Sequence, residues 1–235
     1  MLATIINVFL VLAGSAAGLL FKNLISEKLM AILTQALGLC VLGIGISNVL
    51  GTQDMLCVIV CMVLGTVLGN AVDIERRLEG AGDLLRARFA KGEGGGRFAE
   101  GFVNASLLFC VGAMAITGSI EAGLNHNYEI IVSKGVIDGV TSISFAATMG
   151  IGTAFSAIPL LIYQGGITLL AGWLGPCLPE AVITEMTAAG GALIVGIAIN
   201  MLGLGKERVK VGNMLPAMFL PIAYIPLAQW LAGLF

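Results

Sequence analysis

The chain has 235 residues, of which 58% are hydrophobic and only 11% are charged, and its mean hydropathy is +1.01. Soluble domains carry about 25% charged residues, so this composition excludes a water-soluble protein. The formal net charge is −2. We expect a lipid bilayer around the chain and no nucleic-acid partner.

The apolar residues fall into runs near the roughly 20 residues that cross a hydrocarbon core. The first run starts at Met1 without a basic segment before it, which indicates a retained span rather than a cleaved signal peptide. We therefore predict an all-α, polytopic transmembrane helical bundle that forms one integral membrane domain over 1–235. Its eight expected spans are 2–21, 29–50, 55–72, 99–119, 129–149, 152–174, 181–203 and 212–233.

Basic residues concentrate between the third and fourth runs, in a loop at 74–98. Short loops rich in Lys and Arg face the cytoplasm. With eight spans, the other two loops that hold Lys or Arg, 22–28 and 204–211, fall on the same side, and both termini fall outside. The basic residues of the loop are Arg76, Arg77, Arg86, Arg88, Lys91 and Arg97, whereas the loops 51–54, 120–128 and 175–180 contain no Lys or Arg.

The first part of this basic loop, residues 74–89, has apolar residues at a spacing typical of an amphipathic helix on a membrane surface. A solvated connector that ends in the flexible sequence GEGGG is an equally good interpretation.

Small residues and prolines indicate how the spans pack. The pairs Gly14/Gly18 and Gly65/Gly69 have the Gly-x-x-x-Gly spacing that lets two helices approach closely, within one chain or between two copies. Three prolines in the last span, Pro216, Pro221 and Pro226, predict a kinked or locally unwound helix.

A shift of 152 residues aligns Ile6–Gly14 with Ile158–Gly166 and Asn48–Gly51 with Asn200–Gly203. Under the eight-span topology the aligned segments cross the membrane in opposite directions. We therefore expect two inverted helical repeats, 1–73 and 152–235, around a central pair of polar, discontinuous helices in 99–151. Inverted repeats of this kind are frequent in secondary transporters.

The strongest candidate site lies in the fifth run, where Lys134 and Asp138 are four residues apart on one helical face. Charges at membrane depth are costly and usually functional, although a purely structural ion pair is the alternative. Thr141 and Ser142 follow within a turn. With Gly135 and Gly139 they would suit a broken helix that lines a cavity, or they would simply bond back to the preceding turn.

Four further polar residues extend this region. Asn104, Thr117 and Glu121 belong to the fourth run and its outer end, and Gln164 lies within the sixth. Glu121 is interpreted as either a cation-attracting group at a mouth or an ordinary interfacial carboxylate. Gln164 either lines the same cavity or forms an interhelical hydrogen bond.

The sequence contains no Gly-x-Ser-x-Gly, His-Glu-x-x-His or P-loop motif, so we expect neither an enzyme nor a cofactor or metal site. The leading hypothesis is a small secondary transporter or channel for an ion or small polar solute, with its path through the fourth to sixth spans. The alternative is a membrane scaffold or sensor that acts through the basic loop. A homodimer suits so small a protein.

Three stretches carry a resemblance to a known family. GSIEAG at Gly118–Gly123, KGVIDG at Lys134–Gly139 and YQG at Tyr163–Gly165 are similar to elements of the bacterial family of uncharacterised membrane proteins typified by YdfK and YqgA. The resemblance covers nearly the whole chain. It implies a protein of the bacterial inner membrane and supplies neither a substrate nor a mechanism.

Overall fold

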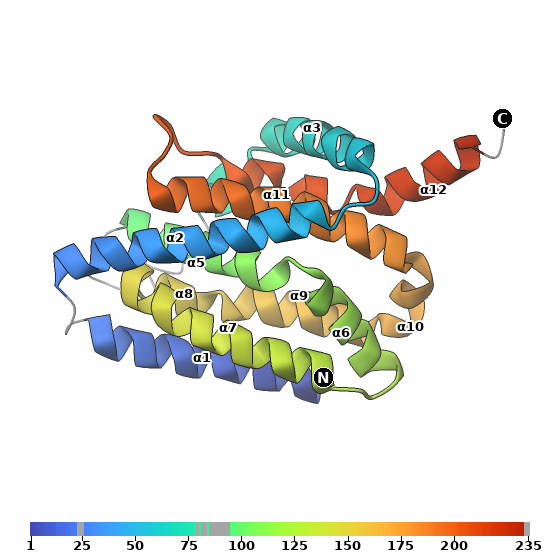
Figure 1. The fold of residues 1–235 in the computed structure, drawn as a ribbon. Coiled ribbons are helices and arrows are strands. Elements are labelled where there is room, and N and C mark those ends of the chain that lie inside the picture. Colours follow the sequence, from blue (N-terminus) through green and yellow to red (C-terminus); the bar gives the residue numbers. More distant parts are fainter. Residues whose placement is uncertain (23–25, 79, 81–83, 85–94, 233–235) are drawn as a thin grey trace.

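The computed structural model describes residues 1–22, 26–78, 80, 84 and 95–232, and in these residues all regular structure is helical. This confirms the predicted all-α bundle (Figure 1). The α-helices are α1 (Leu2–Lys22), α2 (Glu27–Leu50), α3 (Met55–Val72), α5 (Gly95–Cys110), α6 (Ala113–Leu124), α7 (Glu129–Met149), α8 (Gly152–Phe155), α9 (Ala157–Leu169), α10 (Ala171–Leu174), α11 (Glu180–Leu202) and α12 (Pro221–Ala232), and the 3-10 helices are η1 (Gly175–Cys177) and η2 (Val211–Met218).

Five of the described helices, α1, α2, α3, α7 and α11, are long and apolar enough to cross a membrane, and up to seven spans result if each of two bent helix pairs is one span. The α5–α6 pair is bent by 60° and the η2–α12 pair by 43°. The second bend lies among the three prolines that predicted it. The expected sixth span, 152–174, is divided into the three short helices α8, α9 and α10.

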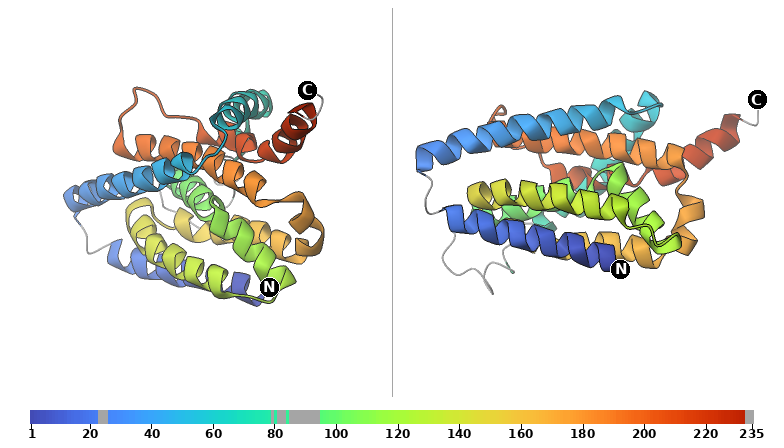
Figure 2. Two further views of the ribbon diagram at one scale, coloured as in Figure 1. Left: turned by 45° about the vertical axis from the view of Figure 1, so that its right-hand side comes forward. Right: turned by 60° about the horizontal axis from the view of Figure 1, so that its bottom comes forward.

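Both described ends of the chain lie toward the same end of the bundle (Figures 1 and 2). The turn after α2, the turn after α6 and the α10–η1 segment lie at this end too. The α7–α8 and α11–η2 turns lie at the opposite end. This arrangement matches the grouping of loops expected from their charges.

Most of the basic loop at 74–98 lies outside the described residues, including the greater part of the expected surface helix at 74–89. Residues 74–78 are helical. The backbone N–H of Glu75 donates to Asn213 Oδ1 at 2.8 Å, and at the other edge of the loop Glu100 pairs with Arg208 at 3.4 Å. Both edges of the loop therefore lie beside the basic 204–211 loop.

The α1 and α7 helices are in direct backbone contact along Gly14 and Gly18. A methyl group at Gly14 would overlap the carbonyl oxygen of Gly139, and one at Gly18 would overlap that of Ile143. Because the contacts advance in the same direction on both helices, α1 and α7 run parallel. The first Gly-x-x-x-Gly motif is thus used within the chain.

Two antiparallel contacts use glycine in the same way. A Cβ at Gly45 of α2 would lie 2.9 Å from the carbonyl oxygen of Gly191 on α11, and Gly65 and Gly69 of α3 lie against the backbone of Ala217 and Asn213 in η2. The second Gly-x-x-x-Gly motif is therefore also an intrachain contact.

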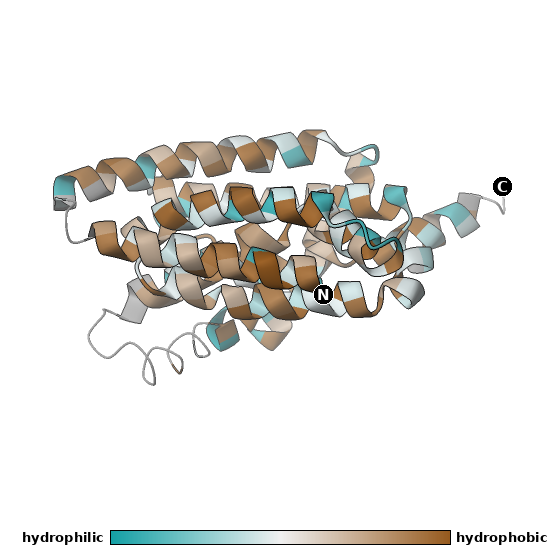
Figure 3. Ribbon diagram, turned by 90° about the horizontal axis from the view of Figure 1, so that it is seen from below, coloured by the Kyte–Doolittle hydropathy of each residue, from teal (hydrophilic) through white to brown (hydrophobic). Residues whose placement is uncertain are grey.

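The α11 helix is the centre of the bundle. In the most apolar 18-residue stretch of α11, 72% of the residues are buried. The same share is 17% in α2, which faces outward. Hydrophobic residues cover most of the length of the helices, and hydrophilic residues gather mainly at the turns (Figure 3). The exposed apolar side chains suit contact with lipid tails.

Of the two alternatives for the fifth span, the broken helix is wrong. The α7 helix is continuous from Glu129 to Met149, and the break lies in the fourth span, between α5 and α6. Gly112 at this break has φ +120°, a backbone conformation that L-residues rarely adopt. Gly135 and Gly139 instead provide space for α1, because a Cβ on either would lie 3.1 Å from a backbone atom of that helix.

Candidate functional site

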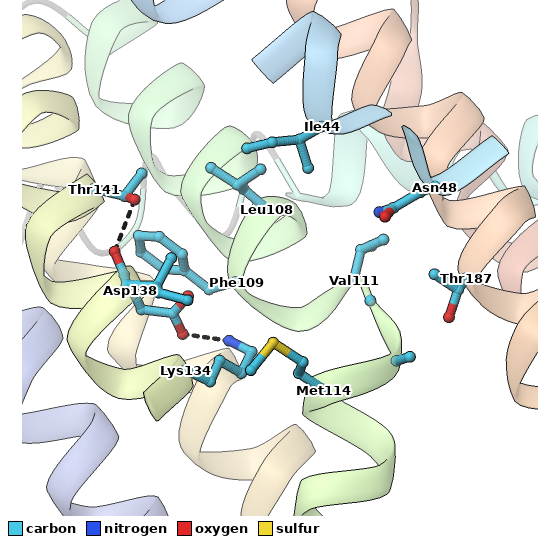
Figure 4. A pocket seen from close by; sticks show the side chains of 13 residues that line it. Ile44, Asn48, Leu108, Phe109, Val111, Met114, Lys134, Asp138, Thr141 and Thr187 are labelled. Carbon is cyan, nitrogen blue, oxygen red and sulfur yellow. Dashed lines mark hydrogen bonds and ion pairs between the residues drawn. The ribbon is translucent and has the colours of Figure 1, made fainter. Parts of the chain in front are cut away.

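Lys134 and Asp138 form an ion pair on the inner face of α7. Each is only 6% exposed, and the Lys134 ammonium donates to Asp138 Oδ2. The predicted pairing on one helical face is confirmed. The lysine side chain points toward the aspartate within the bundle (Figure 4).

A hydrogen-bonded chain continues from Asp138 across two further helices. Asn7 of α1 donates through Nδ2 to Asp138 Oδ2 at 3.1 Å and to Gln164 Oε1 of α9 at 3.0 Å. Asn7 and Gln164 are both fully buried. Gln164 therefore makes an interhelical hydrogen bond, one of the two uses expected for it, and it is joined to the ion pair through Asn7.

A cavity of about 280 Å³ adjoins the ion pair. Lys134, Asp138 and Thr141 line it from α7, while Asn48 of α2 and Thr187 of α11 line it from the facing side (Figure 4). Apolar side chains, among them Ile44, Leu108, Phe109 and Met114, form the rest of the wall. A few polar groups in an apolar enclosure are typical of a small-molecule site.

The broken fourth span forms one wall of this cavity. Val111 and Gly112, which separate α5 from α6, and Ala113 at the start of α6 all line it. A helix break leaves backbone groups without their intrahelical partners. At membrane depth such irregular backbone is tolerated only where protein buries it or where it lines a cavity.

A second cavity, of about 310 Å³, lies further along the same two helices. Ser144 and Thr148 line it from α7, and Leu33, Ala36 and Leu37 line it from α2. It lies nearer the C-terminal end of α7 than the ion pair does. The α2–α7 interface thus contains two hollows, one beside Asp138 and one toward the end of the bundle where α7 stops.

The hydroxyl groups near Asp138 are bonded to backbone. Thr141 donates to the carbonyl oxygen of Ile137 at 2.8 Å, as the back-bonding alternative expected, although it also lines the first cavity. The Ser142 hydroxyl lies 2.8 Å from the carbonyl oxygen of Gly139 and 3.1 Å from that of Val11. Ser142 therefore joins α7 to α1.

Of the eight expected site residues, only Lys134, Asp138 and Thr141 line one of these cavities, so Asn104, Thr117 and Glu121 lie apart from both, as Ser142 and Gln164 do. Asn104 is buried on α5 with its amide nitrogen 3.9 Å from the sulfur of Met149. Thr117 bonds back to the carbonyl oxygen of Ala113 at 2.8 Å. Glu121 is half-buried near the end of α6 and accepts from Asn125 at 2.9 Å.

Asn7 and Glu185 are polar residues within apolar runs that the sequence analysis missed. Glu185 of α11 is only 2% exposed. It accepts from the backbone N–H of Gln53 at 2.8 Å and of Asp54 at 3.1 Å, and from the Thr52 hydroxyl at 2.5 Å. The signal that could have identified both residues is the same one that identified Asp138, a strongly polar side chain inside a membrane span.

A family model described as "Protein of unknown function (DUF554)" matches residues 2–225. The chain belongs to this family. No solved structure matches the chain.

Two relatives match the DUF554 chain over nearly its whole length. "Uncharacterized membrane protein YdfK" of Bacillus subtilis (strain 168) is 34% identical over 227 residues, 94% of each chain. "Uncharacterized protein YqgA" of Escherichia coli (strain K12) is 28% identical over 231 residues, 97% of this chain and 96% of that protein. The resemblance inferred from the sequence is confirmed, and the chain is a membrane protein.

Proposed function

We propose that the protein is a small secondary transporter or channel in a bacterial inner membrane that conducts an ion or a small polar solute past Asp138. The observation that carries the proposal is the cavity of about 280 Å³ with the Lys134–Asp138 pair in its wall. An apolar chain places two buried charges beside a hollow large enough for a small solute. A purely structural ion pair would need no such hollow.

The unused hydrogen-bond donors and acceptor of the ion pair support a binding role. A lysine ammonium has three donors and a carboxylate accepts at two oxygens, yet within the described part of the chain the pair uses only one donor of Lys134 and one oxygen of Asp138. The remaining donors and the remaining oxygen suit a solute that offers both acceptors and donors, or water in its place.

The packing between the expected repeats supports a transporter architecture. The 152-residue shift aligns Gly65 with Ala217, and these two residues lie in contact. The same shift aligns residue 44 with residue 196. Gly45 contacts Gly191 and Val195, so the two antiparallel helices meet close to these aligned positions. Aligned helices that meet at aligned residues are what a two-fold axis in the membrane plane requires. We therefore retain the inverted repeat as part of the proposal.

Flux through liposomes tests the proposal. The purified protein is reconstituted, and uptake of glycerol, urea, alanine, sodium, potassium and protons is followed by light scattering and ion-sensitive dyes. We expect wild-type protein to raise the rate for at least one of these probes above that of empty liposomes. The double variant Lys134→Ala/Asp138→Asn is expected to lower that rate at least tenfold.

The double variant is the informative one because it leaves no unpaired charge. Removing one partner of a buried ion pair costs about 3–5 kcal/mol, so Lys134→Ala or Asp138→Asn alone can fail by misfolding. A double variant that elutes as folded protein and keeps its full flux would show that the pair is structural. If no probe crosses faster than in empty liposomes, the proposed function is wrong.

A further inference from the structure

A second polar region lies on the side of Asp138 toward α1 and α9. Thr4 and Asn7 are one turn apart on α1, Gln164 and Thr168 are one turn apart on α9, and the Asn7–Gln164 hydrogen bond joins the two helices. We call these four residues the α1–α9 polar row. Thr4, Asn7 and Gln164 are fully buried and Thr168 is 6% exposed.

Each side chain of the polar row keeps a polar atom without a hydrogen-bond partner among the described residues. These atoms are Thr4 Oγ1, Asn7 Oδ1, Gln164 Nε2 and Thr168 Oγ1. Buried polar atoms in proteins are almost always paired, and a bilayer offers no compensating partner. Four of them at one helix interface indicate a ligand that this interface holds.

The chemistry of Asn7 and Gln164 determines which of their atoms stay free. A carboxylate only accepts hydrogen bonds, so Asn7 must turn its amide nitrogen toward Asp138. Gln164 must then offer its oxygen to that same nitrogen. The free set consequently holds one acceptor, Asn7 Oδ1, one donor group, Gln164 Nε2, and two hydroxyls that do both.

Water is the ligand that satisfies this mixed set. A bare cation would leave Gln164 Nε2 facing a positive charge, and an anion would face Asn7 Oδ1, whereas one water molecule donates to Asn7 Oδ1 and accepts from Gln164 Nε2. The helices are also less tightly packed here than α1 is against α7, since a Cβ at Gly165 would make ordinary van der Waals contact with the ends of the Met1 and Leu161 side chains, at 3.5 Å and beyond, and would overlap no backbone.

We propose that the α1–α9 polar row holds ordered water and forms an aqueous path from Asp138 to the end of the bundle that carries the N-terminus. Thr4 and Thr168 both lie on that side of the Asn7–Gln164 bond, because α1 starts at that end and α9 runs toward it (Figure 1). Asp138 then lies between the cavity of α2 and α7 and the ordered water held by the α1–α9 polar row. The inference rests on the proposed function only in taking Asp138 as the inner end of this path.

Reactivity of cysteines with Ag⁺ tests the path, because this small cation reacts with thiols only where water admits it. The five native cysteines are replaced by alanine or serine, and single cysteines are introduced by Thr4→Cys and Thr168→Cys. Their matched controls are Ile5→Cys and Leu169→Cys, adjacent positions at the same depth whose side chains are 55% and 69% exposed toward lipid. The protein in liposomes is treated with silver nitrate, and the remaining thiol is labelled with a maleimide dye after unfolding.

We expect the cysteines at positions 4 and 168 to react at least tenfold faster than their lipid-facing neighbours. Equal rates at the paired positions, in protein that elutes as the folded species, would show that the interface is dry and overturn the inference. The outcome is distinguishable from that of the flux experiment. Fast silver reaction without flux of any probe removes the proposed function and leaves the path, whereas flux with unreactive cysteines does the reverse.

Discussion

At the scale of single residues, the two carboxylates inside membrane spans have different surroundings. Asp138 faces a lysine, an asparagine and a cavity. Glu185 also lines a cavity, of about 330 Å³, but both of its oxygens accept hydrogen bonds from the turn at 52–54 and fix that turn to α11. This contrast leads us to assign Asp138 to the path and Glu185 to the attachment of the α2–α3 turn.

Replacing Glu185 tests that assignment. Glu185→Ala leaves two backbone N–H groups and a hydroxyl without their acceptor, and we expect it to lower the free energy of unfolding by about 1–3 kcal/mol. Glu185→Gln keeps an acceptor oxygen and is expected to retain most of the stability. The measurement is the thermal unfolding midpoint in detergent.

Glu180→Ala serves as the control for this change, since Glu180 is an exposed carboxylate in the first turn of the same helix. If Glu185→Ala and Glu180→Ala unfold at the same temperature, the hydrogen bonds to Glu185 do not stabilise the fold and the assignment fails.

At the scale of helices, glycine serves two different purposes in this chain. At Gly112 it permits a backbone conformation that ends α5 and starts α6. At Gly14 and Gly18 it removes the side chain that would separate α1 from α7. Hydropathy and composition cannot distinguish these uses, because both leave the same letter in the sequence.

Enlarging the contact glycines should separate the helices. Gly14→Ala and Gly18→Ala place a methyl group on a facing carbonyl oxygen, and overpacking of this kind costs about 1–3 kcal/mol. We expect each variant to give a lower thermal midpoint and less folded protein in size-exclusion chromatography. Gly43→Ala is the matched control, because nothing lies within 4 Å of a Cβ at that position. Equal losses from all three substitutions would contradict the tight α1–α7 contact.

The two uses of glycine also explain how much of the structure can be predicted from the sequence. Five of the eight expected spans agree with single long helices, because apolar runs are a local property of the chain. A break at Gly135 and Gly139 was one of two alternatives for the fifth span, and the break lies instead at Gly112, because the role of a glycine depends on the helix that faces it. Lys134 and Asp138 could be paired from their spacing alone, but Asn7 and Gln164 are brought to them by contacts across 131 and 157 residues.

At the scale of the whole molecule, the turns sort into two ends. The turns after α2 and after α6 lie at the end toward which both termini point, and the loop between α11 and η2 lies at the other (Figures 1 and 2). From the positive-inside rule we therefore propose that both termini face away from the cytoplasm.

Protease protection of epitope tags checks this orientation. We expect a tag at the N-terminus and a tag at the C-terminus to be cleaved in intact spheroplasts, and a tag inserted between residues 204 and 208 to be cleaved only in inverted vesicles. Termini that are cleaved from opposite sides would contradict the common end of the bundle. Termini that are both protected in spheroplasts would reverse the orientation.

The hydrogen bond between Asn7 and Asp138 also has a consequence during synthesis, because it can form only after residue 138 has been made. The two residues are 131 positions apart, and a ribosome that adds about 5–20 residues per second needs on the order of ten seconds to reach the second after the first. The α1 helix is made before the residues that accept hydrogen bonds from Asn7. The glycine face that later accepts α7 is open during the same interval. We therefore expect α1 to depend on the insertion machinery until α7 is made.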